Sequence, residues 1–521
     1  MRVAEEAARD AQTDAELFLR ATESPVLAAA GFDELRADAS HAARSATKLI
    51  ASLILTWAIA LIVRIIVPRL LGPELFGQYQ FAESFTVMLF VLTNFGVDTY
   101  IRKEVSRNAQ HASDFVGGVL ALRVIGSAVI ILTTITALAW MGKPAHVREL
   151  VVIMCIVQML VLANQLAAAM LQAVGQVDGL AAVSVGAKLL WGASILFGLS
   201  SGLGVRSVAL GLFASELLRA AVLWRLSRRH LGLRLRVNVP ATKLVLAASA
   251  PFFINDLAFT AAARMDVGIM SFMTNDREVG WYAVASNIAG LAMLLTPIIA
   301  SVFLPLSSRA AARSDEEVAM IARRAMQLVL SFAIPVTLGL ALAADVLVDV
   351  MFGAAFSPAA ASLRVLAPIF VLTYVAMITS LLLTTIGRGW TLTKIALSAL
   401  VLTPALNVVF IPWGLAKFGP GGAGIGAATA MVLCEFYMAC LMAWMVRRYI
   451  FDRTGVVNLG KMLAVALFVI LLHLMLASLG SWRLLADAVV YVFGVLWWGA
   501  VDLRTLFNLL RRPAPIATEG S

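Results

Sequence analysis

Long apolar segments recur along the whole chain, and they constrain its fold more than any other feature. Each has about 20 residues and few charges, which is the length at which an α-helix crosses the hydrocarbon core of a bilayer. We expect spans near Lys48–Val67, Tyr79–Thr99, Phe115–Trp140, Val151–Leu171, Leu180–Leu199, Leu203–Leu226, Leu244–Met270, Trp281–Leu306, Met326–Ala343, Val365–Thr385, Leu392–Trp413, Gly422–Trp444, Met462–Leu479 and Leu484–Leu506. The sequence therefore predicts an all-α polytopic membrane protein with about 14 transmembrane helices.

The composition excludes several other classes. The chain is 61% hydrophobic and 14% charged, whereas a soluble domain is about half apolar and about a quarter charged. Its three cysteines, Cys155, Cys434 and Cys440, fall inside apolar segments without the spacing of a disulfide framework or a zinc site. The five histidines are scattered along the chain. We therefore expect no metal site, no cofactor and no soluble catalytic domain.

Basic residues are distributed unequally between the two sides of the expected spans. If the N-terminus is inside, the inner connections and tail carry Arg102, Lys103, Arg107, Arg225, Arg228, Arg229, Arg234, Arg236, Arg309, Arg313, Arg323, Arg324, Arg447, Arg448, Arg453, Arg511 and Arg512. The outer side has mainly Arg69, Lys143, Arg148, Arg206, Arg277, Lys417 and Arg483. This asymmetry is the one that the positive-inside rule describes. It predicts that both termini are cytoplasmic, and it explains the net charge of +10 without a nucleic-acid partner.

An internal repeat indicates how the spans are organised. Phe76–Ser84 and Val279–Asn287 share the pattern apolar-Gly-x-Tyr-x-x-Ala at an offset of 203 residues, and each follows the first span of a block of six. Blocks of six spans share one orientation, so we expect two six-helix lobes related by a pseudo-twofold axis along the membrane normal. The expected parts are a cytoplasmic N-terminal tail (1–43), a first lobe (44–227), a basic cytoplasmic linker (228–243), a second lobe (244–447), two extra helices (448–510) and a C-terminal tail (511–521).

Charged residues inside the spans are the candidate functional residues, because a charge at the bilayer centre is costly. The candidate cations for an anionic substrate are Arg123, Lys188, Arg219 and Arg264, and the candidate coupling or cavity acids are Asp256, Glu216 and Asp266. For Glu216 and Arg219, spaced i,i+3, a local ion pair is the alternative.

The seventh expected span is the most informative segment. Asp256, Thr260 and Arg264 follow i, i+4, i+8 and would share one stripe, and Pro251 one turn earlier can bend the helix. The alternative is a buried Asp256–Arg264 pair that holds two helices together. Other charges, at Arg64, Asp98 and Lys394, lie near span ends, where long side chains can snorkel.

Several short motifs together resemble one family. They are Leu71–Tyr79 (LGPELFGQY), Asn94–Asp98 (NFGVD), Ile101–Val105 (IRKEV), Val279–Tyr282 (VGWY), Met351–Gly353 (MFG), Leu363–Ala367 (LRVLA), Asn407 with Ile411–Pro412, and Gly422–Ala427 (GAGIGA). In this order they resemble the bacterial polysaccharide-repeat flippases of the Wzx or O-antigen type, in the multidrug/oligosaccharidyl-lipid/polysaccharide (MOP) exporter superfamily. The glycines Gly422 and Gly426, with Ala430, are expected to form a close helix-packing face.

The resemblance implies a central cavity between the lobes and a non-enzymatic function in the bacterial inner membrane. Members flip polyprenyl-diphosphate-linked oligosaccharides between leaflets, so the implied partners are the lipid-linked glycan, membrane lipid, and a polymerase or glycosyltransferases of the same pathway. No catalytic residue is implied. Arginine and lysine in the cavity would offset dehydration of the diphosphate.

Three other functions fit the sequence less well. A drug or cation antiporter of the same superfamily would need a cavity dominated by acids. A lipid II flippase would have a similar fold, so the expected fold alone does not separate this alternative from a flippase of polysaccharide repeat units. A membrane polysaccharide polymerase or ligase would carry a large outer loop, and the sequence has none.

Overall fold

The computed structural model describes residues 25–107 and 112–499. The first half contains α2 (Pro25–Phe90), η1 (Val91–Thr93), α3 (Val97–Arg107), α4 (Ala112–Trp140), α5 (Ala145–Ala173), α6 (Val177–Ser200) and α7 (Val205–Leu231). The second half contains α8 (Val239–Ala262), α9 (Met265–Met273), α10 (Asp276–Ala289), η3 (Gly290–Leu295), α11 (Thr296–Ala311), α12 (Asp315–Leu342), α13 (Ala344–Phe352), η4 (Ala354–Phe356), α14 (Ala359–Leu366), α15 (Ile369–Thr385), α16 (Gly389–Phe418), α17 (Gly422–Met445), α18 (Arg447–Ile450), α19 (Arg453–Met475), η5 (Ala477–Trp482) and α20 (Arg483–Trp497). The expected C-terminal tail and residues 1–24 of the expected N-terminal tail lie outside the described residues.

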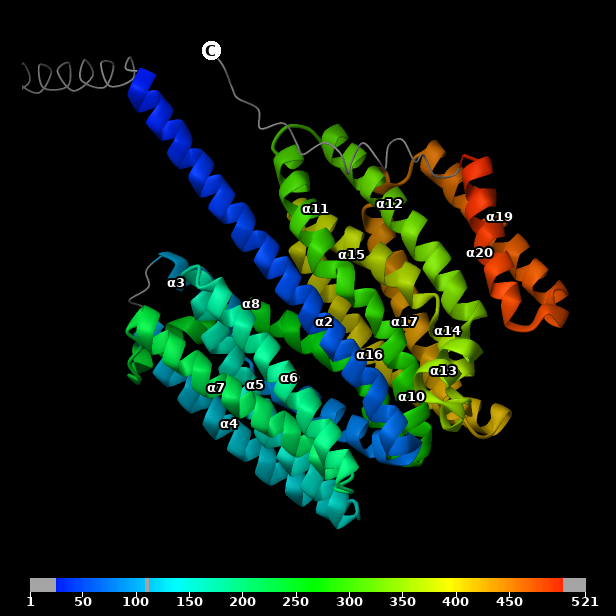
Figure 1. Ribbon diagram of the computed structural model, residues 1–521, viewed down its shortest axis with the longest axis horizontal. Coiled ribbons are helices and arrows are strands. Elements are labelled where there is room, and N and C mark those ends of the chain that lie inside the picture. The colour runs from blue at the N-terminus through cyan, green and yellow to red at the C-terminus, as the bar shows by residue number, and fades with distance from the viewer. Residues whose placement is uncertain (1–24, 108–111, 500–521) are drawn as a thin grey trace, which may run out of the picture.

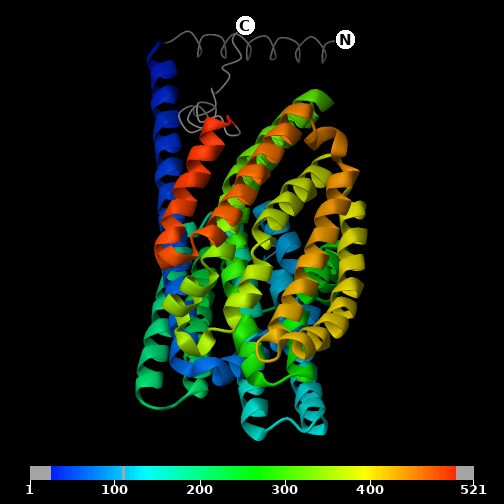
Figure 2. The ribbon, with the colours of Figure 1, turned by 90° about the vertical axis from the view of Figure 1, so that its right-hand side faces the viewer.

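The expected fold class is confirmed. Eleven helical segments of the described residues are long and apolar enough to cross a membrane, and this part of the chain contains no strand. The helices form two groups, with the long helix α2 running between them (Figure 1). Helices α3–α7 lie on one side of it and α10–α17 on the other, while α19 and α20 lie at the outer edge of the second group beside α12. Figure 2 shows the same bundle from the side.

The two copies of the repeat motif pack directly against each other. A Cβ atom added to Gly77 would lie 1.8 Å from the carbonyl oxygen of Asp276, and one added to Gly280 would lie 1.8 Å from the carbonyl oxygen of Pro73. Pro73 and Asp276 are themselves 203 residues apart. The two contacts are therefore equivalent, because each residue of one contact has its repeat counterpart in the other. A twofold axis between α2 and α10 requires this arrangement. Only glycine allows the helices to approach this closely.

The helix breaks also recur at matching positions. Helix α2 is kinked at Gly72, whose φ of 73° is in the left-handed region, and the matching position lies between α9 and α10. After the repeat motif, α2 passes into the 3₁₀ turn η1 and α10 passes into the 3₁₀ turn η3. The second expected span, which was predicted to continue to Thr99, is therefore interrupted after Phe90. Residues Phe95 and Gly96, both with positive φ, form the break.

Four polar contacts join the first half of the chain to the second half around the α2 kink, and we call them the seam. Gln78 Nε2 donates to Asp276 Oδ2 at 3.0 Å, and Arg277 lies 3.7 Å from Glu74. Arg69 Nη1 donates to the carbonyl of Val350 at 3.1 Å, and Lys143 Nζ donates to the carbonyl of Ser271 at 3.0 Å. Lys143 follows the last residue of α4, so the seam lies about 40 Å from the other end of that 29-residue helix.

Three expected local features around the junction of the halves are corrected. Helix α7 continues to Leu231 and α8 begins at Val239, so the segment without helix is 232–238 rather than 228–243. The helix does not open at Pro251, which lies inside α8; it breaks at Ala263 and Arg264 instead. The predicted stripe of Asp256, Thr260 and Arg264 is therefore interrupted before its last member. The new helix α9 begins with Asp266 in its first turn, where an acidic side chain is favourable.

The predicted glycine face is confirmed. A Cβ atom on Gly422 would lie 2.3 Å from the carbonyl oxygen of Gly414, and one on Gly426 would lie 2.0 Å from that of Phe410. Helices α16 and α17 thus pack backbone to backbone, as small residues at four-residue spacing permit.

Candidate functional site

Six ionisable residues from four parts of the fold form a group that we call the charged cluster. They are Arg64 and Glu83 of α2, Lys188 of α6, Glu216 and Arg219 of α7, and Arg264 at the break between α8 and α9. Lys188 interacts electrostatically with Glu216, Arg219, Glu83 and Arg64. Its Nζ also lies 4.7 Å from the centre of the Trp191 ring, a cation–π contact.

Glu216 anchors one side of the charged cluster. The expected local ion pair is present, because Arg219 Nη1 lies 3.6 Å from Glu216 Oε2. The same carboxylate accepts a hydrogen bond of 2.8 Å from Asn164 Nδ2 on α5, and Asn164 also donates to the carbonyl of Glu216 at 3.0 Å. Glu216 is buried, whereas the Arg219 side chain is 23% exposed. The arginine is therefore the accessible half of this pair.

Tyr79 connects the other side of the charged cluster. This tyrosine of the repeat motif is buried and hydrogen-bonded to Glu83, and it interacts electrostatically with both Arg64 and Arg264. Arg64 is exposed, while Glu83 and Arg264 are half-buried. Residues from the first span of each lobe thus meet near one tyrosine.

The composition of the charged cluster determines what it can bind. The four cations outnumber the carboxylates near them, which are Glu83 and Glu216 of the cluster and Asp266 beside Arg264. Partly buried cations attract an anion more strongly than cations in water, because the effective dielectric is lower. Arginine adds paired N–H donors that match phosphate oxygens. The arrangement therefore suits an anionic ligand with phosphate oxygens, such as a diphosphate.

Arg123 lies in a separate group, which we call the Arg123 network. Its side chain is 2% exposed, and its Nη1 donates to the carbonyl of Leu162 at 2.7 Å. Its Nη2 reaches Asp98 Oδ1 at 3.0 Å, Asn94 Oδ1 at 2.9 Å and the Asn94 carbonyl at 3.0 Å. Asn94 Nδ2 in turn donates to Asp256 Oδ2 of α8 at 2.5 Å. The network therefore joins the first lobe to the first helix of the second.

The Arg123 network corrects two expectations. Asp98, expected to snorkel, is instead bound to Arg123, and its side chain is only 18% exposed. Asp256 does not pair with Arg264, because its recorded partner is Asn94. Asn94 and Asp98 belong to the NFGVD motif, and the backbone break at Phe95 and Gly96 brings both side chains to Arg123.

Asp266 borders the charged cluster, because it interacts electrostatically with Arg264. It is 4% exposed, its Oδ1 accepts from the backbone N–H of Val267 at 2.8 Å, and its Oδ2 accepts from the hydroxyl of Tyr282. Both carboxylate oxygens are therefore used inside the second lobe.

The structure thus brings together four predicted site residues, Lys188, Glu216, Arg219 and Arg264. It places Arg123 with Asp256 elsewhere. Sequence reasoning missed the roles of Arg64, Glu83, Asn94 and Asp98. A signal for Glu83 was available, since it follows the Tyr79 of the repeat motif by four residues, one helical turn.

An all-helical bundle of two related lobes, with partly exposed charges inside its spans, defines the class of a polytopic membrane transporter. The family model for polysaccharide biosynthesis proteins matches residues 42–311, and the chain belongs to this family.

Comparisons with individual proteins agree with this class. The chain is 21% identical over 370 residues to the probable low-salt glycan biosynthesis flippase Agl15 of Haloferax volcanii, covering 70% of this chain and 76% of Agl15. Its fold is similar to that of a multidrug resistance MATE family transporter of the MOP superfamily, with a TM-score of 0.63, 16% identity, and coverage of 78% of this chain and 98% of the other. It is also similar to the lipid II flippase MurJ, with a TM-score of 0.57, 14% identity, and coverage of 87% and 100%.

Proposed function

We propose that this protein is a flippase that moves polyprenyl-diphosphate-linked oligosaccharide repeat units across a membrane by alternating access. The observation that carries the proposal is the charged cluster, whose excess of cations complements a diphosphate. Membership of the polysaccharide biosynthesis family and the likeness to Agl15 support a lipid-linked glycan as the substrate. Flipping makes and breaks no covalent bond, so the protein acts as a transporter and not as an enzyme.

The proposed mechanism uses the cations of the charged cluster. The diphosphate binds Lys188, Arg219, Arg264 and Arg64, and it competes with Glu216 for Arg219. The two carboxylates neutralise part of the positive charge of the cluster when no substrate is bound. They thereby lower the free-energy cost of holding the cations close together in the empty site. The prenyl chain remains in lipid, and the lobes rock about the site to expose it to either side.

The proposal extends to the setting of the protein. The basic connections support a bacterial inner-membrane protein with both termini cytoplasmic. A polymerase or glycosyltransferases of the same pathway would supply and use the flipped unit.

Replacement of single cations tests the function. Lys188→Ala and Arg264→Ala should reduce surface glycan at least tenfold, because each removes a contact to the diphosphate, while the amount of protein in the membrane stays near normal. The readout is surface glycan in a strain that depends on this gene. Lys394→Ala is the matched control, since Lys394 is exposed on α16 and lies outside the charged cluster. Unchanged surface glycan in both cluster variants would remove these residues from the site.

Asp256 is the proposed coupling acid. It is exposed on the first helix of the second lobe, and its bond to Asn94 can break when the lobes move. Asp256→Asn should change the dependence of transport on the proton or sodium gradient, measured in vesicles with an imposed gradient. A response identical to that of the parent protein would exclude Asp256 from coupling.

A further inference from the structure

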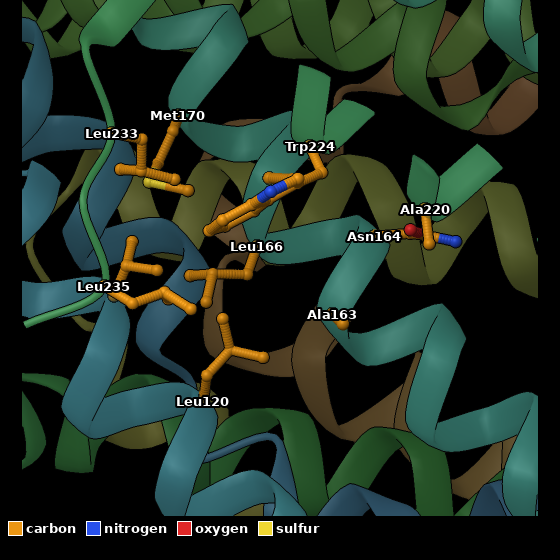
Figure 3. A pocket seen from close by; sticks show the side chains of 11 residues that line it. Leu120, Ala163, Asn164, Leu166, Met170, Ala220, Trp224, Leu233 and Leu235 are labelled. Carbon is orange, nitrogen blue, oxygen red and sulfur yellow. The ribbon is translucent and has the colours of Figure 1, made fainter. Parts of the chain in front are cut away.

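An apolar cavity lies in the wall of the first lobe, apart from the charged cluster. Its volume is about 250 Å³, and it is enclosed by α4, α5, α7 and the segment that follows α7. Figure 3 shows side chains from these elements converging on it, among them Leu120, Leu166, Met170, Trp224 and Leu235. Asn164 also lines the cavity, but its amide nitrogen is bonded to Glu216. The cavity therefore suits hydrocarbon rather than a sugar or a phosphate.

The segment 232–238 closes one end of this cavity, and we call it the strap. Its sequence alternates leucine and arginine, and Leu233 and Leu235 line the cavity. The alternate residues Arg234 and Arg236 are exposed. Among the described residues, neither arginine forms an ion pair with an acid. The strap thus presents an apolar face to the cavity and two unpaired cations outside it.

The strap is fixed in place by α4. The backbone N–H of Arg234 donates to Ser113 Oγ at 3.2 Å, and a Cβ atom on Gly117 would lie 2.1 Å from the carbonyl oxygen of Arg236. Both contacts are in the first turns of α4, whose N-terminal end carries partial positive charge. The two cations are therefore held beside the start of α4, whose first turn also contains the acidic residue Asp114.

The cavity lies close to the N-terminal end of α4. On α4 it is lined by Val116 and Leu120, four and eight residues beyond Ala112, which places them about 6 and 12 Å from that helix end. An anionic head group at the strap and an acyl chain in the cavity would thus be arranged as in a single lipid of one leaflet. Arg228 and Arg229 in the last turn of α7 are not part of this site, because basic residues there offset the helix dipole.

We propose that the cavity and the strap form a binding site for an anionic phospholipid of the surrounding membrane. One acyl chain enters the cavity, and the phosphate binds Arg234 and Arg236. Basic groups at the boundary of spans are a known means of holding anionic head groups. The existence of this site does not rest on the proposed transport function.

A resident phospholipid is favoured over the flipped lipid because the cavity is closed toward the charged cluster. The connection between them consists of the hydrogen bonds from Asn164 to Glu216, and these residues are 1% and 5% exposed. A lipid in the cavity therefore has no open path through this wall to the cations that would hold a diphosphate.

Native mass spectrometry of the full-length protein, purified and delipidated in mild detergent, tests the site. The probes are phosphatidylglycerol and phosphatidylcholine with the same acyl chains. The parent protein should bind phosphatidylglycerol at least tenfold more tightly than phosphatidylcholine. The double variant Arg234→Gln/Arg236→Gln should lose this preference. The control is Arg309→Gln/Arg324→Gln, which removes the same charge from two exposed arginines, one near the end of α11 and one in the third turn of α12, and should bind as the parent does.

A second variant tests the cavity itself. Ala163→Phe places a ring in the cavity and should weaken binding of phosphatidylglycerol at least tenfold, with size-exclusion profile and melting temperature checked first; Leu120→Trp replaces it if it does not fold. Equal binding of the two phospholipids, equal loss in the Arg309/Arg324 control, or parent-like binding by a folded cavity variant would each overturn the proposal. Tighter binding of a polyprenyl phosphate than of phosphatidylglycerol would also overturn it and assign the cavity to the flipped lipid.

Discussion

At the scale of single residues, Arg123 shows how a candidate for binding can instead hold the structure together. A buried arginine with no nearby acid on its own helix is the pattern expected of a cation that binds an anionic substrate. Its partners come from the NFGVD break and from α5, far away in sequence. Spacing rules find pairs on one helix, such as Glu216 and Arg219. They cannot find partners brought together by a change of backbone direction.

Removal of the Arg123 side chain should destabilise the protein rather than only stop transport. Arg123→Ala leaves Asp98 and Asn94 without their donor, and breaking a buried ion pair costs about 3–5 kcal/mol. We expect a lower melting temperature in detergent and less protein in the membrane. Arg309→Ala, at an exposed position, is the control. Asp98→Asn in the Arg123→Ala background should recover part of the loss, and an unchanged melting temperature in Arg123→Ala would refute the structural role.

At the scale of elements, the sequence predicts helices where a pattern repeats, but it does not predict helix breaks that tertiary contacts determine. The apolar periods and the repeated Gly-x-Tyr motif predicted the spans and their pairing. The break at Ala263 and Arg264 has no glycine or proline to announce it, whereas Pro251, which suggested a bend, lies inside α8. Arg64 looked like a snorkelling residue because it lies near the end of an apolar run, yet α2 continues to the kink at Gly72.

The packing of α2 on α10 gives a prediction at this scale. Gly77→Ala and Gly280→Ala should each destabilise the protein by about 1–3 kcal/mol, the usual cost of overpacking, because the added methyl group meets a backbone carbonyl. Thermal unfolding in detergent measures the effect. The matched control is Gly186→Ala on α6, where the added methyl group meets nothing within 4 Å. Similar melting temperatures for all three variants would contradict the symmetric contact.

At the scale of the whole molecule, alternating access requires the seam to open. Cross-linking should therefore stop transport. In a Cys440→Ser background, which removes the exposed native cysteine, a bifunctional thiol reagent would join Glu74→Cys to Arg277→Cys, at positions whose side chains lie 3.7 Å apart in the parent. We expect at least a tenfold loss of transport, reversed by a cleavable linker.

The control for this experiment joins two residues that both lie in the second half of the chain, away from the seam. Arg313→Cys with Glu317→Cys, on either side of the start of α12, should be cross-linked without loss of transport. Full activity of the cross-linked Glu74→Cys/Arg277→Cys protein would show that the seam does not need to open.

The position of the strap has a consequence for the transport cycle. Seven residues tether one half of the molecule to the other and also border a hydrocarbon pocket. If the strap moves with the two halves, its movement must change the shape of the pocket. By thermodynamic reciprocity, a ligand in the pocket must then shift the conformational equilibrium of the strap. The composition of the host bilayer would then act as an input to the transport cycle, setting how often the halves exchange positions even when glycan supply is constant.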